Sequence, residues 1–133
     1  MPQAYDRWLG GPVAAHDFAA ALMASLERVF PGDPPTFVAD VPHGYADIEV
    51  IAGDLRAGGL ECRSVESLTL QGRADSAADV AAGFCTGTPL RLAIEARGDL
   101  AAATALVQDE MTARLGAGPV TARMTAHVFE AQP

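Results

Sequence analysis

The stretch Val120-Thr121-Ala122-Arg123-Met124-Thr125-Ala126-His127-Val128 carries the clearest structural signal in the chain. Apolar and polar side chains alternate at every position, which is typical of a β-strand with one buried and one solvent-facing side. We therefore predict a half-buried strand within 119–130. Its wet face is expected to carry the polar side chains, and His127 is interpreted as a surface histidine.

A second strand is predicted over about 60–70. There Cys62, Leu68 and Leu70 share one phase of the alternation, whereas Val65 has the opposite phase. A β-bulge near Ser64 would reconcile the two phases. The two strands flank a helical region, so antiparallel pairing between them is geometrically possible. We predict an α+β fold with an antiparallel sheet of two to three strands (about 60–70 and 119–130) and four to five helices.

Helix boundaries are predicted from capping residues, prolines and glycines. Between the first two helices, 36–41 is expected to be extended, because Pro42 disfavours a helical backbone in the residue before it. The expected helices cover 12–30, 47–57 with Asp47 as N-cap, a short segment from Ser76 through Phe84, 89–98, and 99–115 with Asp99 as N-cap. Ser76 is the expected N-cap of the short segment, because Asp79 three residues on makes the pair close to a capping box.

Length, composition and charge limit the function. The 133 residues suit one domain, and half of them are hydrophobic, so a packed core is expected. The formal net charge is −8 and there is no lysine, which argues against a nucleic-acid or anionic membrane partner. No apolar run approaches the roughly 18 residues of a membrane span. The two cysteines are too few for a disulfide scaffold, and no segment resembles a signal peptide, so we expect a soluble cytoplasmic protein.

Side chains able to carry chemistry are few and scattered. His16, His43 and His127 do not share the four-residue helical spacing of metal ligands, so no metal site is predicted. Cys62 and Cys85 are interpreted as small buried hydrophobes. The glycines around Ala117 follow a predicted helix and precede a strand, which is the wrong order for a phosphate-binding loop. No catalytic residue is assigned.

Two loops are candidate substrate-binding segments. The first carries His43 beside Tyr45, and a loop with a hydrogen-bonding ring and an aromatic ring is able to line a pocket. Its alternative interpretation is a turn that stabilises only itself. The second begins with Phe84, Cys85 and Thr86, and it either closes over a small substrate or merely connects two helices. These five residues are the predicted substrate-binding set.

Several separated motifs occur in an order shared with a known enzyme family. They are 30–37 (FPGDPPTF), 41–47 (VPHGYAD), 57–60 (AGGL), 83–90 (GFCTGTPL) and 123–128 (RMTAHV). The first two motifs together resemble the segment after the fifth strand of bacterial class I S-adenosylmethionine-dependent methyltransferases. The third resembles the turn before the sixth strand of that family, the fourth its last helical insertion and the fifth its seventh strand. The resemblance covers roughly 16–130.

The resemblance implies a single domain, 1–133, in which 12–130 is the C-terminal, substrate-side part of such an enzyme and 1–11 is flexible or lid-like. Tyr5-Asp6-Arg7-Trp8-Leu9-Gly10 resembles the opening of the same family, so Tyr5 and Arg7 are predicted cofactor-binding residues. The Gly-rich loop and ribose-binding acidic residue of the family's Rossmann half are missing. The chain alone is therefore expected to bind no S-adenosylmethionine and to lack independent methyl-transfer activity.

The missing half also predicts a partner. A strand hairpin that has lost its neighbouring strand exposes unpaired backbone groups, so we expect a homodimer joined through the sheet edge or an exposed apolar face. The first hypothesis is a methyltransferase-like protein that either binds a small hydrophobic or aromatic molecule or serves as a structural fragment. The alternatives are a small-molecule methyltransferase completed by a cofactor-binding partner protein or by a dimer, and a stand-alone α+β binding or dimerising module.

Overall fold

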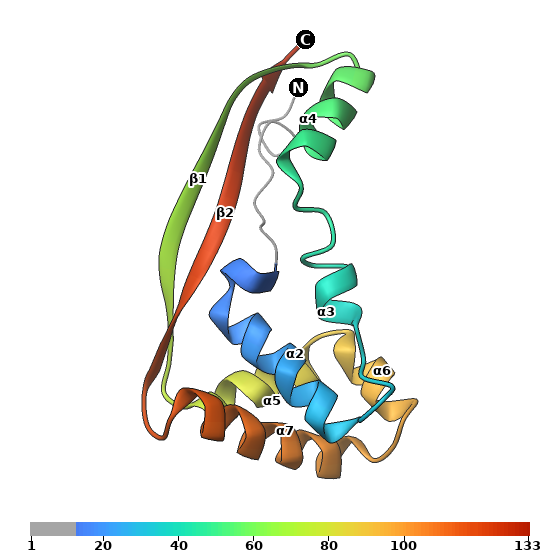
Figure 1. The fold of residues 1–133 in the computed structure, drawn as a ribbon, viewed down its shortest axis with the longest axis vertical. Helices are drawn as coiled ribbons and strands as arrows, with labels where there is room; N and C mark the ends of the chain where they lie inside the picture. Colours follow the sequence, from blue (N-terminus) through green and yellow to red (C-terminus); the bar gives the residue numbers. More distant parts are fainter. Residues whose placement is uncertain (1–12) are drawn as a thin grey trace.

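The computed structural model describes residues 13–133. Two long strands, β1 (Glu61–Ala74) and β2 (Val120–Gln132), form an antiparallel ribbon, and the described helices lie along one side of it (Figure 1). One helix, α4, packs beside one end of the ribbon, and the others gather at the opposite end. The helical elements are η1 (Val13–Ala15), α2 (Asp17–Val29), α3 (Phe37–Asp40), α4 (Ile48–Ala57), α5 (Ala77–Gly87), α6 (Leu90–Glu95) and α7 (Leu100–Leu115).

The predicted α+β class with an antiparallel sheet is confirmed. Within residues 13–133 the sheet has two strands, and there are six α-helices, of which α3 and α6 are only 4 and 6 residues long. Three predicted N-caps are also confirmed. The side chains of Asp47, Ser76 and Asp99 accept hydrogen bonds from backbone N–H groups in the first turns of α4, α5 and α7.

Two predictions near the start of the chain are wrong. The segment 36–41 is not extended, because it contains the short helix α3. The hydroxyl of Thr36, the residue before this helix, donates to Asp40 at its end. The helix predicted over 12–30 is divided, since the backbone of His16 is extended (φ −124°, ψ 98°) and separates η1 from α2. His16 is therefore the residue before α2 and not part of a continuous helix.

The register of the ribbon confirms the predicted bulge. The pairing runs from Ala74 opposite Val120 to Glu61 opposite Gln132, and it shifts between Cys62 and Ser64. Both strands are longer than predicted, because polar residues such as Gln71 and Arg73 continue the pairing beyond the apolar stretch. A period of two indicates where a strand lies, but polar ends of strands do not stand out from loops.

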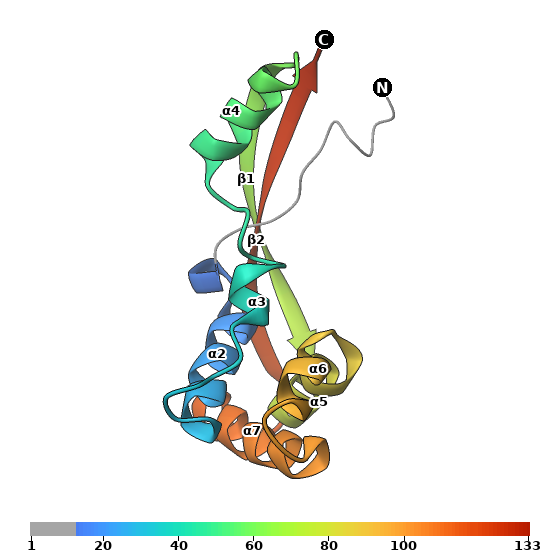
Figure 2. The ribbon, with the colours of Figure 1, turned by 90° about the vertical axis from the view of Figure 1, so that its right-hand side faces the viewer.

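The ribbon does not bury one continuous face, which corrects the interpretation of its clearest strand. Val120 and Ala122 are buried at the helical end, whereas Phe129 and Ala131, on the opposite face, are buried at the other end. Between them, Met124 remains 47% exposed. The strands twist about each other along their length (Figures 1 and 2), as isolated two-stranded ribbons do, so each face meets helices only once.

The main hydrophobic core lies where α2, α5, α6 and α7 meet. Its side chains recur at three- and four-residue spacings along α2 and α7, as expected for one apolar face of each helix. The buried members are Ala19, Leu22, Leu26, Val38, Ala77, Ala81, Cys85, Leu90, Ile94, Ala103, Val107, Met111 and Val120. Ile51 of α4 and Phe129 and Ala131 of β2 are buried outside this core, at the other end of the ribbon.

None of the helices within residues 13–133 has both the length and the apolar character required to cross a lipid bilayer.

Candidate functional site

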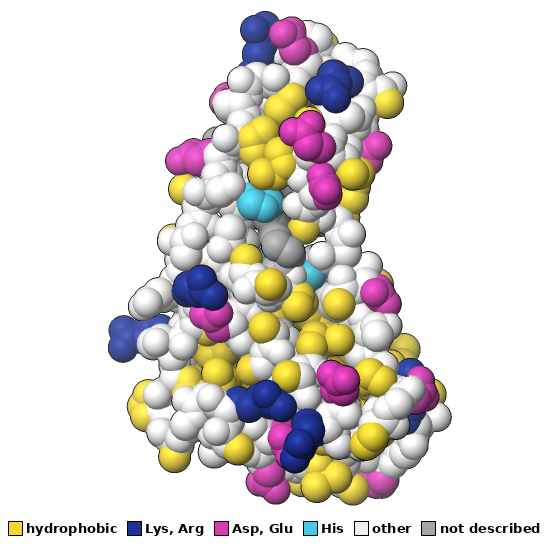
Figure 3. All heavy atoms as spheres, viewed as in Figure 1, with side chains coloured by type: hydrophobic (Ala, Val, Ile, Leu, Met, Phe, Trp, Pro, Cys, Tyr) yellow, Lys and Arg dark blue, Asp and Glu magenta, His cyan; other side chains and the backbone are white. Residues whose placement is uncertain are grey.

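A small hollow lies between the ribbon and the helical body, with a volume of about 210 Å³. Its walls come from the start of α2, the turn after α3, the C-terminal part of α5 and the first half of β2. Histidine side chains are visible at this narrow middle part of the molecule in Figure 3. The described residues that line the hollow are His16, Phe18, Ala19, His43, Phe84, Arg123 and Met124.

His16 occupies the N-cap position of α2 but does not cap the helix with its side chain. Its backbone N–H donates to the Val13 carbonyl and its own carbonyl accepts from Ala20, so the backbone is held on both sides. The imidazole Nε2 is buried, and none of residues 13–133 gives it a hydrogen-bond partner. A polar atom buried in this way is costly, so it is typical of a functional position.

The rings of His16 and His43 lie against each other, with centroids 4.4 Å apart and planes inclined by 53°. Burial lowers the pKa of His16, and the neighbouring His43 lowers it further, while the Thr125 backbone and Asp17 act in the opposite direction. The pKa of the His16 imidazole therefore lies below its usual value of 6.5, which means that its charged form is disfavoured. At neutral pH His16 presents an uncharged imidazole beside the hollow.

A tight turn after α3 sets the position of His43. The His43 N–H donates to the Val38 carbonyl at 3.2 Å, and the Gly44 N–H donates to Val41 at 3.4 Å. A Cβ at Gly44 would overlap the backbone carbonyl of Asp40, so only glycine fits this turn. The sequence His-Gly thus turns the chain back and directs His43 toward α2.

Gly72 of β1 fixes the ribbon side of the hollow. A Cβ at this position would lie 2.9 Å from Sδ of Met124 and 3.5 Å from Cε2 of Phe18. The missing side chain therefore leaves the space that the thioether and the aromatic ring occupy. Sulfur and aromatic groups together make a polarisable, apolar wall.

An ion pair joins the helical body to the ribbon beside the hollow. The Arg123 guanidinium donates to Asp17 with Nη2 2.8 Å from Oδ1, and the Arg123 backbone N–H donates to Oδ2 at 2.8 Å. The Arg123 side chain is the main cause of a lowered pKa of the Asp17 carboxyl. The charge of Arg123 is thus paired with Asp17, and the other residues that line the hollow are mainly apolar.

The structure brings together two of the five predicted substrate-binding residues. His43 and Phe84 line the same hollow, although they come from distant segments. Tyr45 lies elsewhere, and its hydroxyl donates to Asp54 at 2.5 Å. Cys85 is fully buried in the main core, and the Thr86 hydroxyl donates to the Ala82 carbonyl within α5. The predicted loop at 84–86 is in fact the C-terminal part of α5, in which successive side chains point in different directions.

Five residues that line the hollow were not predicted: His16, Phe18, Ala19, Arg123 and Met124. His16 was set aside because the sequence shows no second histidine at metal-ligand spacing. Phe18 and Met124 lie in segments predicted as a helix and a strand, where apolar side chains are ordinary. No signal in the sequence marked His16, because the helix predicted over 12–30 included it, and only the structure places it directly before α2.

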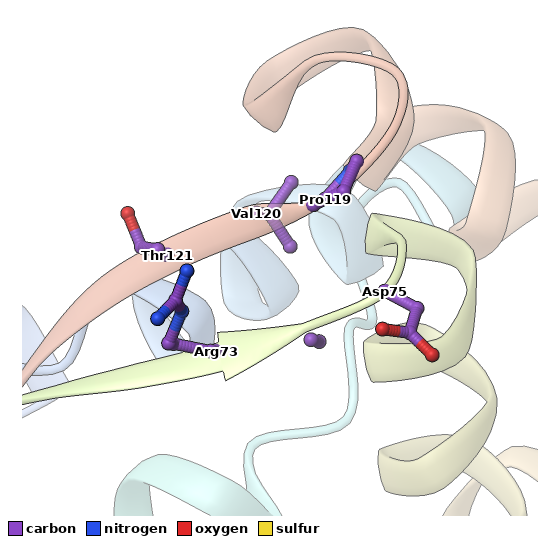
Figure 4. A pocket seen from close by; sticks show the side chains of 6 residues that line it. Arg73, Asp75, Pro119, Val120 and Thr121 are labelled. Carbon is purple, nitrogen blue, oxygen red and sulfur yellow. The ribbon is translucent and has the colours of Figure 1, made fainter.

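A second depression, of about 530 Å³, lies where β1 leaves the ribbon and β2 enters it. Figure 4 shows Arg73 reaching toward Thr121 of the neighbouring strand, while Asp75 points away on the side of α5. Arg73 and Asp75 carry opposite charges and are both exposed. The lining of this depression is much more polar than that of the hollow, and small-molecule sites are mostly apolar, so we do not assign it a ligand.

The described sheet differs from the parallel sheets in which nucleotide cofactors such as S-adenosylmethionine bind. In open α/β sheets such nucleotides bind at the carboxyl ends of parallel strands, whereas this sheet has two antiparallel strands. The N-terminus of α5, which follows β1, is capped by its own Ser76. Tyr5 and Arg7, the predicted cofactor-binding residues, lie outside the described residues. Among residues 13–133, no three His, Cys, Asp or Glu side chains are grouped to hold a metal ion.

Comparisons with protein-family models, with curated proteins and with solved structures gave no match for this chain.

Proposed function

We propose that this chain is a methyltransferase-like, substrate-side module that binds a small, mostly apolar ring compound in the hollow and does not transfer a methyl group by itself. One observation carries the proposal. His43 and Phe84, which come from the two motifs that resemble substrate-side segments, line one hollow together.

The size of the hollow defines the ligand class. Pockets for drug-sized molecules usually measure about 300–1,000 Å³, and this one has about 210 Å³. Phe18, Phe84 and Met124 offer apolar and aromatic contacts, and the two imidazoles offer hydrogen-bonding groups at one side. A single aromatic ring that carries one polar substituent matches this combination. A nucleotide-sized cofactor is too large for it.

The cysteines support the proposed cytoplasmic location. Both Cys62 and Cys85 are free thiols, and unpaired cysteines are common in reducing compartments.

Phenol is a suitable probe, because it combines one aromatic ring with one hydroxyl group. We expect calorimetry and NMR titration to show saturable binding of phenol at one site, with shifts at His43 and Phe84. Phe84→Ala removes an aromatic wall and is expected to weaken binding. Leu92→Ala, an equally apolar truncation at a side chain that is 68% exposed, is the matched control and should bind like the unmodified chain.

Gly72→Ala tests the same hollow by the opposite change. The added methyl group must displace the Met124 thioether, which lines the hollow, while alanine favours an extended strand over glycine. We expect weaker phenol binding with an unchanged fold. Failure of phenol and related single-ring compounds to bind, or stoichiometric binding of S-adenosylmethionine to the chain alone, would overturn the proposal.

A further inference from the structure

The outer strand of the ribbon is exposed along nearly its whole length. In β1 only Cys62, Gly72 and Ala74 are half-buried, and all other residues are exposed. Leu70 is 65% exposed and Leu68 is 40% exposed. An exposed strand edge with neighbouring leucines is a template for pairing with another strand.

The other edge of the ribbon contacts the helical body in the first half of β2. The Arg123 N–H points away from β1 and donates to Asp17 at the start of α2. In an antiparallel ladder, opposite residues alternate between pairs that bond to each other and pairs that face outward. Arg123 lies opposite Gln71, so Gln71 also faces outward, and the same holds at every second residue along β1. The outward N–H and C=O groups therefore belong to Val65, Ser67, Thr69, Gln71 and Arg73.

We propose that β1 pairs antiparallel with β1 of a second copy of this chain, with Thr69 on the two-fold axis. The two ribbons then form one continuous four-stranded sheet. This proposal concerns the edge opposite the hollow and does not depend on the ligand proposed above.

The regular part of β1 selects this register. The bulge between Cys62 and Ser64 ends regular pairing on one side, and the strand ends at Ala74 on the other. The midpoint of Ser64–Ala74 is Thr69, so pairing about Thr69 matches the full regular segment with itself. Each outward residue then meets an outward residue of the other copy. Such pairs exchange both of their backbone hydrogen bonds.

Side chains agree with the same register. On one face, Leu68 of each copy lies opposite Leu70 of the other, and the four leucines form a continuous apolar group. Glu66 lies opposite Gly72, and Val65 lies opposite Arg73, so no like charges face each other. A register centred on Glu66 would instead oppose two carboxylates, and registers centred farther along the strand would leave outward groups unpaired.

The size of the contact predicts a reversible dimer. At about 3.3 Å per residue, the regular segment is roughly 36 Å long, and a sheet with side chains on both faces is about 10 Å thick. The joined edge therefore covers several hundred Å² per copy, below the roughly 800 Å² per partner of a standard stable interface. The net charge of −8 per chain also opposes association at low salt. We expect dissociation on dilution.

Hydrogen exchange on the unmodified chain gives a direct test. In the dimer, the N–H groups of Ser67, Thr69 and Gln71 are bonded across the new edge, and in the monomer they face solvent. Raising the protein concentration should slow their exchange at least tenfold, in parallel with a doubling of the 13.8 kDa mass in light scattering. The N–H groups of Leu68 and Leu70 bond to β2 and should be protected at all concentrations.

Thr69→Pro tests the edge with a matched control. Proline removes the outward N–H and obstructs the edge, and it is tolerated on edge strands when that N–H faces solvent. Thr69→Ala removes the same hydroxyl but retains the N–H. We expect Thr69→Pro to be monomeric and Thr69→Ala to dimerise. Two results on the unmodified chain would contradict the proposal, even if Thr69→Pro fails to fold. One is a chain that stays monomeric at sub-millimolar concentration, and the other is a dimer in which the outward amides exchange freely.

Discussion

Replacing Phe129 by alanine should destabilise the α4 end of the molecule selectively. Phe129 is the largest of the fully buried side chains and is only 1% exposed, yet it lies outside the main core. Truncation of a buried phenylalanine costs about 3–5 kcal/mol, since the transfer free energy of the ring and the cavity left behind both count. A domain of this size is stable by about 5–15 kcal/mol in total. The loss is therefore a large part of the local stability.

The location of Phe129 decides where that loss is felt. The thirteen buried members of the main core are untouched by the substitution, so the helical body should keep its packing. We expect amides of α4 and of the last residues of β2 to exchange much faster in the variant, while those of α7 change little. Native-state hydrogen exchange by NMR measures both regions in one sample.

Leu92→Ala serves as the control, because Leu92 is 68% exposed and its truncation should change stability by less than about 0.5 kcal/mol. Equal acceleration in α4 and α7 of the Phe129→Ala variant would show that the two buried groups unfold as one unit. A loss below about 1 kcal/mol would show that Phe129 contributes no more than an average position. Either result refutes the division into a main core and a separate cluster.

Three further predictions concern single residues. Asp47→Ala removes the acceptor of the Glu49 and Val50 N–H groups and should cost about 1 kcal/mol in urea unfolding, whereas Asp47→Asn should retain most of the stability. The pKa of His16 in the folded chain lies below 6.5, so the unfolded chain binds this proton first as the pH falls, and the free energy of unfolding should decrease below pH 6.5. His16→Gln should reduce this decrease, measured between about pH 8 and pH 5. The contribution of Asp17, whose pKa is lowered from 3.8, should disappear only in stronger acid. Cys85 is buried, and this burial raises the pKa of its thiol. A thiol reagent should therefore modify Cys62 in the folded chain and reach Cys85 only on unfolding. Rapid modification of both cysteines in the folded chain would contradict the burial of Cys85.

The local signals in the sequence were sufficient for most of the secondary structure. Asp47, Ser76 and Asp99 each cap the helix predicted for them, because a side-chain acceptor at that position satisfies N–H groups that no helix can satisfy internally. The failures occurred where a local preference was overruled by neighbours. The segment at 36–41 was predicted as extended from Pro42, but this local preference did not hold even for the residue before the proline. Val41 has a right-handed backbone (φ −110°, ψ −71°), and at the end of α3 its N–H donates to the Phe37 carbonyl.

The candidate site was only partly predictable for a related reason. Phe84 and Cys85 are adjacent in sequence and were assigned to one loop, but consecutive residues on a helix point about 100° apart. As a result Phe84 reaches the hollow while Cys85 enters the core. His16 and His43 have no local relation at all, and they meet only because the glycine turn after α3 brings the chain back to the start of α2.

Residue order alone was enough for the α+β class, the bulge at Ser64 and the ends of most helices, because alternation, capping and chain reversal act over a few neighbouring residues. The ribbon's change of buried face, the contact between the two histidines and the open edge of β1 depend on twist and on segments far apart in the chain. Such features arise only when the whole chain packs, since no short stretch contains the partners that produce them.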